Sequence, residues 1–210
     1  MLTDSTVRRF LDDAAADVPS PGGGSASALA GALGAAMASM AANFTLGRKR
    51  FADVADQVRC LLEVCERVRT ELTDLIDADA RAYEALCAAR RLPADSSADK
   101  KKRDQATREA ARKAAGVPLA AVRLCLELLC ACRGLLPLVN PALVSDVGVA
   151  ASLAAAALEG AALNVEVNLP SVGDPDYVAS TRGDILQSLH EGRAIRDDLI
   201  AAVTEKVSRP

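Results

Sequence analysis

The sequence predicts an all-α fold formed by a single domain that spans residues 1–210. Almost every segment places its apolar residues at helical spacing, and only the short VEVNL near position 167 resembles a strand. Half of the residues are apolar, so the chain has ample material for a core. With no internal repeat or long linker, we expect one bundle of about six to eight helices, one of them long.

The first two helices are predicted from a capping residue and a run of small residues. Ser5 precedes a periodic segment from Thr6 to Ala16. A second helix is expected from Ser25 to Leu46, directly after SPGGG. Within it, small residues recur every four positions, at Ser27, Gly31, Ala35 and Ser39. This smooth stripe is typical of a central helix with close neighbours on several sides.

The third helix is the long one, from about Phe51 to Arg91, and it stops before Pro93. A charged loop, DSSADKKKRDQ, leads into a solvated helix. Gly116-Val117-Pro118 predicts a kink or break there, because proline has no N–H to donate to the preceding turn. The next helix, LAAVRLCLELLCACRG, is expected to end at Gly134.

The carboxyl-terminal third is predicted from two turn signals. Asn140-Pro141 opens a turn, after which Ser145 or Asp146 would cap an apolar helix that reaches about Val165. Asp174-Pro175 combines a capping residue with a first-turn proline and so marks the start of the last helical region.

Composition argues against several classes of protein. A net charge of −3, a pI near 5.3 and 2% aromatic residues do not suit a nucleic-acid binder. The start, MLTDSTVRRF, is not a secretory signal, and the longest uncharged run, Val18 to Leu46, is too rich in Ala and Gly for a membrane span. Six cysteines with one histidine lack the spacing of a zinc site. We therefore expect a cytoplasmic protein with reduced thiols, no metal, no membrane and no nucleic acid.

Asp79 is the first polar residue found where an apolar one is expected. It continues the apolar seam of the long helix at spacings of three and four, between Leu75 and Tyr83. A buried carboxylate with a raised pKa suits a general acid or base. The alternative is that the core face rotates onto Ile76 and Ala80 and leaves Asp79 at its edge.

A second group of polar residues interrupts the apolar segment NPALVSDVGVAASLAAAALEGAALNVEVN, at Asn140, Asp146, Asn164 and Asn168. Asp146 and Asn164 are five turns apart, so they share one helix face but are separated by about 27 Å. They therefore serve opposite ends of a long ligand, or the helix breaks, or a second subunit supplies one of them. A simple cap at Asp146 and a helix stop at Asn168 are the structural alternatives.

Two further motifs flank the small-residue helix. GRKRF follows it at positions 47–51, where the cations favour the negative end of the helix dipole and where Lys49 could also anchor an anion. The glycine run precedes it. Glycines there would let backbone N–H groups approach a ligand at a helix amino end, or would only allow close helix packing.

Taken together, PSPGGGSASALAGALG, TLGRKRF and NP…SDVGVAA…GAALNVEVN resemble the cyclodeaminase/cyclohydrolase family. This family includes the carboxyl-terminal domain of formiminotransferase-cyclodeaminase and stand-alone methenyltetrahydrofolate cyclohydrolases. The motifs occur in matching order from about Val7 to Ser171. The resemblance implies an all-helical homodimer that acts on the one-carbon unit of tetrahydrofolate, which is a substrate, and implies no metal.

The resemblance also implies site residues. Catalytic candidates are Asp146, Asp79 and Lys49; substrate-binding candidates are Gly22, Gly23, Gly24, Ser25, Arg48, Asn140, Asn164 and Asn168. One departure is the basic turn, because relatives often have a lysine-rich turn followed by Tyr, whereas here Arg48 and Arg50 flank the single Lys49 before Phe51. Since Arg does not replace Lys as a proton donor, the activity could differ here.

The resulting prediction is an enzyme that cyclises formiminotetrahydrofolate with release of ammonia or hydrolyses methenyltetrahydrofolate to formyltetrahydrofolate. The alternatives are a folate-dependent one-carbon condensation in a specialised pathway and a non-catalytic helical dimer. We further expect the glycine run and Asn164 to reach one active site from different subunits.

Overall fold

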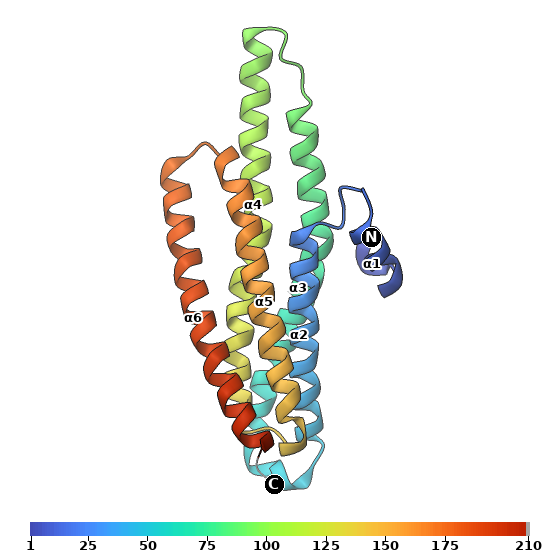
Figure 1. Ribbon diagram of the computed structural model, residues 1–210, viewed down its shortest axis with the longest axis vertical. Helices are drawn as coiled ribbons and strands as arrows, with labels where there is room; N and C mark the ends of the chain where they lie inside the picture. Colours follow the sequence, from blue (N-terminus) through green and yellow to red (C-terminus); the bar gives the residue numbers. More distant parts are fainter. Residues whose placement is uncertain (209–210) are drawn as a thin grey trace.

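The computed structural model describes residues 1–208, which form a bundle of long α-helices joined by short 3-10 turns (Figure 1). The helices are α1 (Val7–Ala15), α2 (Gly23–Leu46), α3 (Ala55–Arg90), α4 (Ser97–Leu135), α5 (Val144–Asn168) and α6 (Pro175–Ser208). The 3-10 turns are Leu2–Asp4, Lys49–Val54, Pro141–Leu143 and Leu169–Ser171. No strand occurs within the described range, which confirms the all-α prediction.

The five long helices form two layers. Helices α2, α5 and α6 lie side by side over α3 and α4, and consecutive long helices run antiparallel (Figure 1). The ends of α3 and α4 extend beyond α2 and α5 as a hairpin. This leaves the amino end of α2 and the carboxyl end of α5 against the side of the hairpin, so these helix ends can line a recess.

The small residues of α2 allow the close packing that the sequence predicts. A Cβ on Gly31 would lie 3.0 Å from the Cys125 sulfur, and one on Gly34 would lie 3.0 Å from the Ala150 carbonyl oxygen. Ala35 and Ala38, on the same helix, are completely buried. Helix α2 is therefore the central element of the bundle and contacts α3, α4 and α5.

Of the kink or break predicted at Gly116-Val117-Pro118, the break is wrong, because α4 continues through this segment. Pro118 cannot donate to the Ala114 carbonyl as an ordinary helical residue would. The Asn168 amide of α5 donates to that carbonyl instead, at 3.2 Å. An amide from the neighbouring helix thus satisfies the acceptor that Pro118 leaves free.

Three local predictions near helix ends are also corrected. VEVNL is not a strand but the last turn of α5 and its continuation, where the β-branched valines pack as helical residues. Ser145 and Asp146 lie in the first turn of α5 rather than at its cap, because the turn Pro141–Leu143 leads directly into the helix. The cap of α1 is Thr6, not Ser5.

Other predicted ends are confirmed. The Asp174 carboxylate accepts a hydrogen bond from the Tyr177 N–H at 3.1 Å, as a capping residue should.

All six cysteines are free thiols. Helix α2, helix α4 and the stretch Pro141–Ser171 are long and apolar enough to cross a membrane by length and composition, although at least half of each such window is buried inside the bundle.

The amino-terminal segment is fastened to α3 by Asp77. Its carboxylate accepts hydrogen bonds from the Leu2 N–H at 2.5 Å and from the Thr3 hydroxyl at 2.6 Å. Burial acts to raise the pKa of Asp77, but these hydrogen bonds and the terminal ammonium outweigh it, so its pKa is lowered. Phe10 is the buried anchor of α1, against Ala28 and Ile76.

We expect this attachment to weaken in acid. Because the folded-state pKa of Asp77 is lowered, its contribution is present above the unfolded value of about 4 and is lost as the pH falls through the folded pKa. Asp77→Asn should remove the charge at every pH. Hydrogen exchange at the Leu2 amide should then be fast at neutral pH in the variant and slow in the wild type. Equal protection in both proteins would contradict this role.

Candidate active site

The predicted site residues lie in two groups at opposite ends of the bundle. We call the first the glycine-end cluster: Gly22, Gly23, Gly24, Ser25, Asp79, Asn164 and Asn168. The second, the basic-end cluster, comprises Arg48, Lys49, Arg50, Asn140 and Asp146. Helix α2 has 24 residues and separates the two groups by about 36 Å. A single copy therefore cannot apply both to one small reacting centre.

Asp79 meets the amino end of α2. Its Oδ2 accepts hydrogen bonds from the Ser25 N–H at 2.8 Å and from the Ser25 hydroxyl at 3.0 Å. Gly22, at the cap position of α2, has no side chain to satisfy these helix-end donors, so the carboxylate from α3 does it. Oδ1 has no hydrogen-bond partner among residues 1–208. Asp79 thus combines a helix-capping role with one free carboxylate oxygen.

The glycines of the run leave room for these polar side chains. A Cβ on Gly24 would lie 2.6 Å from Asp79 Oδ2 and closer still to Oδ1, and a Cβ on Gly23 would lie 3.0 Å from the Asn164 amide nitrogen. Helix α2 begins at Gly23, two residues earlier than predicted, so both glycines lie in its first turn. Their N–H groups have no partner in the described part of the chain and are available to a ligand.

The two asparagines of α5 complete this cluster. Asn164 donates to the Gly160 carbonyl at 2.8 Å, and Asn168 donates to the Asn164 carbonyl at 3.0 Å. Each amide nitrogen is therefore engaged, whereas neither side-chain oxygen has a partner within residues 1–208. These oxygens can accept hydrogen bonds from a ligand.

A pocket of about 240 Å³ joins these groups. Its lining includes Gly22, Gly23, Gly24, Asp79, Asn164 and Asn168 together with Tyr83, Leu86, Arg90 and Val167. Tyr83 and Arg90 were not predicted as site residues. Their spacing from Asp79, at four and eleven positions, places all three on one face of α3 and would have identified them.

Tyr83 and Arg90 add a hydroxyl donor and a cation to the pocket. The Cys87 thiol beside Tyr83 raises the pKa of the tyrosine hydroxyl above its ordinary value. Arg90 donates to the Ser171 hydroxyl at 3.1 Å. The pocket therefore has a cation of its own, Arg90, whereas Lys49 lies at the other end of the bundle.

At the other end of the bundle, Asn140 has a structural role. It is 2% exposed, its N–H donates to the Thr45 hydroxyl at 2.9 Å, and its side-chain oxygen accepts from Arg50 at 2.6 Å and from the Ala142 N–H at 3.3 Å. The Asn140 Nδ2 group has no partner among residues 1–208, so this residue can hold the turn and still donate a hydrogen bond to a substrate. It holds the basic turn against the start of α5.

Arg48 and Lys49 are exposed and make no ion pair with any residue in the described range. Arg50 instead stacks on Phe51, with its guanidinium carbon 4.7 Å from the ring centre. Asp146 is half-buried and has no hydrogen-bond or ion-pair partner among residues 1–208. Its place in the first turn of α5 gives this carboxylate a favourable interaction with the helix dipole, and its oxygens remain free to accept hydrogen bonds from a ligand.

One prediction about subunits is wrong. Asn164 lies against Gly23 of the same copy, so the glycine run and Asn164 do not need different subunits to meet. The separation that remains is between the glycine-end cluster and the basic-end cluster, because Asp146 and Asn164 stand at opposite ends of the unbroken α5.

The contact between Gly24 and Asp79 gives a direct test of the glycine run. Gly24→Ala should displace the Asp79 carboxylate and lower the free energy of unfolding by about 1–3 kcal/mol. Gly22→Ala is the matched control, since nothing lies within 4 Å of a Cβ there. Denaturant unfolding should separate the two variants; equal stability would mean that Asp79 is not held as described.

An all-helical bundle with polar groups gathered in a pocket between helix ends is suited to bind a small molecule. The family model described as formiminotransferase-cyclodeaminase matches residues 6–187, and this chain belongs to that family. The predicted resemblance is thereby confirmed.

Individual relatives extend over nearly the whole chain. It is 35% identical to a methenyltetrahydrofolate cyclohydrolase of Methylorubrum extorquens, over 99% of this chain and 100% of the relative. It is 36% identical to the formimidoyltransferase-cyclodeaminase of Sus scrofa over 91% of this chain, but spans only 36% of that protein. The crystal structure of formiminotetrahydrofolate cyclodeaminase from Thermotoga maritima matches with a TM-score of 0.79 and 28% identity, covering 98% of this chain and 97% of the other.

No group of three or more His, Cys, Asp or Glu side chains that could hold a metal ion occurs within residues 1–208.

Proposed function

We propose that this protein is a folate one-carbon enzyme that hydrolyses methenyltetrahydrofolate to formyltetrahydrofolate. The observation that carries the proposal is the pocket at the glycine end, where backbone N–H donors, a carboxylate oxygen and two amide oxygens converge. A pterin ring presents donors and acceptors along its edge, and such an edge suits this set of groups. The co-extensive cyclohydrolase relative supports the same activity.

In this reaction, water adds to the carbon that bridges two folate nitrogens. One carbon–nitrogen bond then breaks, the carbon remains on the other nitrogen as a formyl group, and a proton is released. A carboxylate placed beside the bridge can accept the proton of the attacking water. Two carboxylates are candidates for this role: Asp79, whose Oδ1 is free while Ser25 holds its other oxygen in place, and Asp146, which has no partner among residues 1–208.

The second candidate activity is cyclodeamination, favoured by the likeness to the Thermotoga maritima cyclodeaminase. Here a folate nitrogen attacks the formimino carbon, ammonia leaves, and the methenyl bridge closes. Both reactions form or break a bond at the same carbon and move a proton to or from nitrogen. The same pocket therefore serves either activity.

We further propose that the active site is shared between two copies of the chain. Helix α2 carries no charged residue over its whole length, and its outward face continues onto α5. The exposed apolar residues of this face are Leu29, Leu33, Phe44, Val149, Leu163 and Val167. A twofold axis near the middle of α2 would cover this face and would bring the basic-end cluster of one copy to the glycine-end cluster of the other.

Two assays test the proposed activity. Purified protein should accelerate the loss of methenyltetrahydrofolate absorbance, or should release ammonia from formiminotetrahydrofolate. Removal of both the Asp79 carboxylate and the Asn164 amide should abolish the acceleration. If the protein binds folate but leaves both substrates unchanged, both proposed activities would be contradicted and a different folate-dependent one-carbon reaction would be favoured. If the protein does not bind folate, a non-catalytic dimer would be favoured.

Lys49 is expected to act on folate through charge. The carboxylates of folate are attracted to an exposed lysine by a Coulomb force that salt screens, with a screening length of about 10 Å at 0.1 M ionic strength. Lys49→Ala should therefore weaken folate binding several-fold at low salt and little at 1 M salt. Titrations at both ionic strengths measure this, and Lys101→Ala, at an exposed lysine in the first turns of α4, is the control. A loss that ignores ionic strength would instead assign Lys49 a catalytic role.

A further inference from the structure

An apolar groove lies between α1 and α2, on the side of the bundle away from α6 (Figure 1). It has a volume of about 230 Å³ and is lined by Val7, Phe10, Leu11, Leu29, Ala32 and Ile76, among others. A cavity of about 150 Å³ accommodates benzene, so the groove has room for an aromatic ring. It is open to solvent, because Val7 is 78% exposed and Leu11 is 60% exposed.

Helix α1 is attached to the bundle mainly at two points. Asp77 fastens the residues before it, and Phe10 is its only buried residue. The rest of its apolar face adjoins the uncharged outward face of α2 and has no cover from residues 1–208. An apolar surface of this kind, continuous over two elements, marks an interaction site.

Phe44 is a large exposed side chain at the opposite end of the same face. It is 54% exposed and lies fifteen residues after Leu29 and eleven after Leu33, so the three side chains fall within about 60° of one another around α2. The distance from Leu29 to Phe44 along the axis is about 22 Å. Phe44 therefore cannot enter the groove of its own copy.

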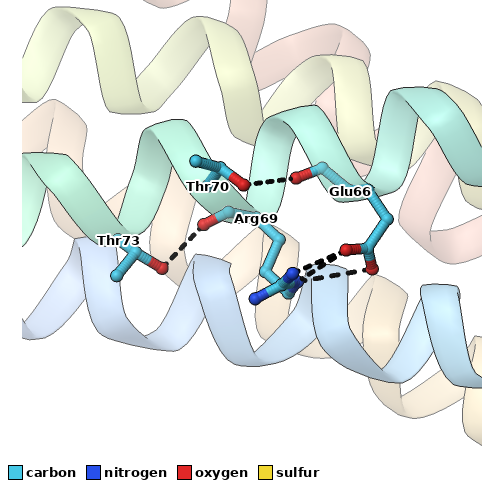
Figure 2. A network of polar contacts seen from close by, with 4 residues as sticks. All are labelled: Glu66, Arg69, Thr70 and Thr73. Carbon is cyan, nitrogen blue, oxygen red and sulfur yellow. Dashed lines mark hydrogen bonds and ion pairs between the residues drawn. The ribbon is translucent and has the colours of Figure 1, made fainter.

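One pair of charged residues on α3 beside this face is satisfied within the same copy. On α3, Glu66 and Arg69 bind each other, with Arg69 Nε 3.2 Å from a carboxylate oxygen, and Thr70 and Thr73 donate to backbone carbonyls (Figure 2). This network lies alongside α2 without placing an unpaired charge on it. The surface around α2 thus suits an apolar partner.

The spacing along α2 selects a second copy as that partner. Phe44 precedes Lys49 by five positions, and Gly24 precedes Leu29 by five positions. A twofold axis that brings Phe44 of one copy to the Leu29 groove of the other therefore also brings Lys49 to the level of Gly24. One rotation would fill both grooves and bring the basic turn of each copy to the glycine end of the other.

We propose that α1 is a clasp that receives Phe44 of a second copy of this chain. The proposal rests on the shared active site described above and adds the contact that fixes its register. It makes the amino-terminal segment part of the subunit interface, although that segment is remote from the pocket chemistry.

Cysteine cross-linking between two single variants tests the clasp. In a Cys60→Ser background, Leu11→Cys and Phe44→Cys chains should form a covalent dimer on mild oxidation only when they are refolded together. Neither variant should cross-link alone, because its own two cysteines would lie far apart. Leu11→Cys with Leu186→Cys is the control pair, since Leu186 is 67% exposed on α6.

The outcomes separate the clasp from the proposed function. A dimer in sedimentation that gives no cross-link would overturn the clasp and leave the shared site standing. A monomer would overturn both, and a monomer that floats with phosphatidylcholine vesicles would assign this face to a lipid surface. As a check that does not depend on oxidation, Phe44→Ala should weaken the dimer tenfold or more; an unchanged dissociation constant would also overturn the clasp.

Discussion

Asp146→Asn is expected to lower turnover by about a hundredfold or more while the melting temperature stays nearly unchanged. Asn keeps the size of the side chain but cannot exchange a proton at neutral pH. Because Asp146 has no hydrogen-bond or ion-pair partner among residues 1–208, its replacement by Asn breaks no hydrogen bond or ion pair within the copy. Steady-state kinetics with methenyltetrahydrofolate and thermal unfolding measure the two effects separately.

Asp198→Asn is the matched control, because Asp198 is an exposed carboxylate on α6 outside both clusters. It should leave turnover and stability unchanged. Full activity in Asp146→Asn would remove Asp146 from the mechanism and leave Asp79 as the proton acceptor. A hundredfold loss accompanied by unfolding would instead give Asp146 a structural role at the first turn of α5.

The helices themselves could be predicted from the sequence, because their period, caps and small-residue spacing are local properties. Helix α2 illustrates this, since the four-residue recurrence that includes Gly31 and Ala35 predicts the close packing that is found. The break at Pro118 was predicted wrongly for a non-local reason. Asn168, fifty residues later in the chain, supplies the hydrogen bond that the proline cannot.

The site could be predicted only in part. Residue types and motifs identified Asp79, Asn164 and the glycine run, and the structure brings these together in one pocket. Asn140 was predicted as a substrate-binding residue from its place in the NP motif, and the structure adds contacts with Arg50 and Thr45 that no local pattern reveals. Arg90 escaped prediction because arginines are common on exposed helix faces.

The sequence showed that the two clusters are separated, but not which residues belong to which cluster. Counting turns shows that Asp146 and Asn164 are far apart, yet only the antiparallel packing of α2 on α5 shows which of them lies beside the glycine run. Because Asn164 lies beside the glycine run, variants of these two elements should not restore activity in a mixed dimer, whereas variants of Asp146 and Asn164 should.

The most direct test of the shared site is therefore activity in mixed dimers of Asp146→Asn and Asn164→Ala chains. Each variant alone should be nearly inactive. After co-refolding, random reassortment should restore about a quarter of wild-type activity, since about half of the dimers are mixed and each has one intact site. Gly24→Ala mixed with Asn164→Ala is the control and should give no rescue, because both lesions lie in the glycine-end cluster. No rescue in confirmed Asp146/Asn164 mixed dimers, or rescue in the control, would contradict a site assembled from two copies.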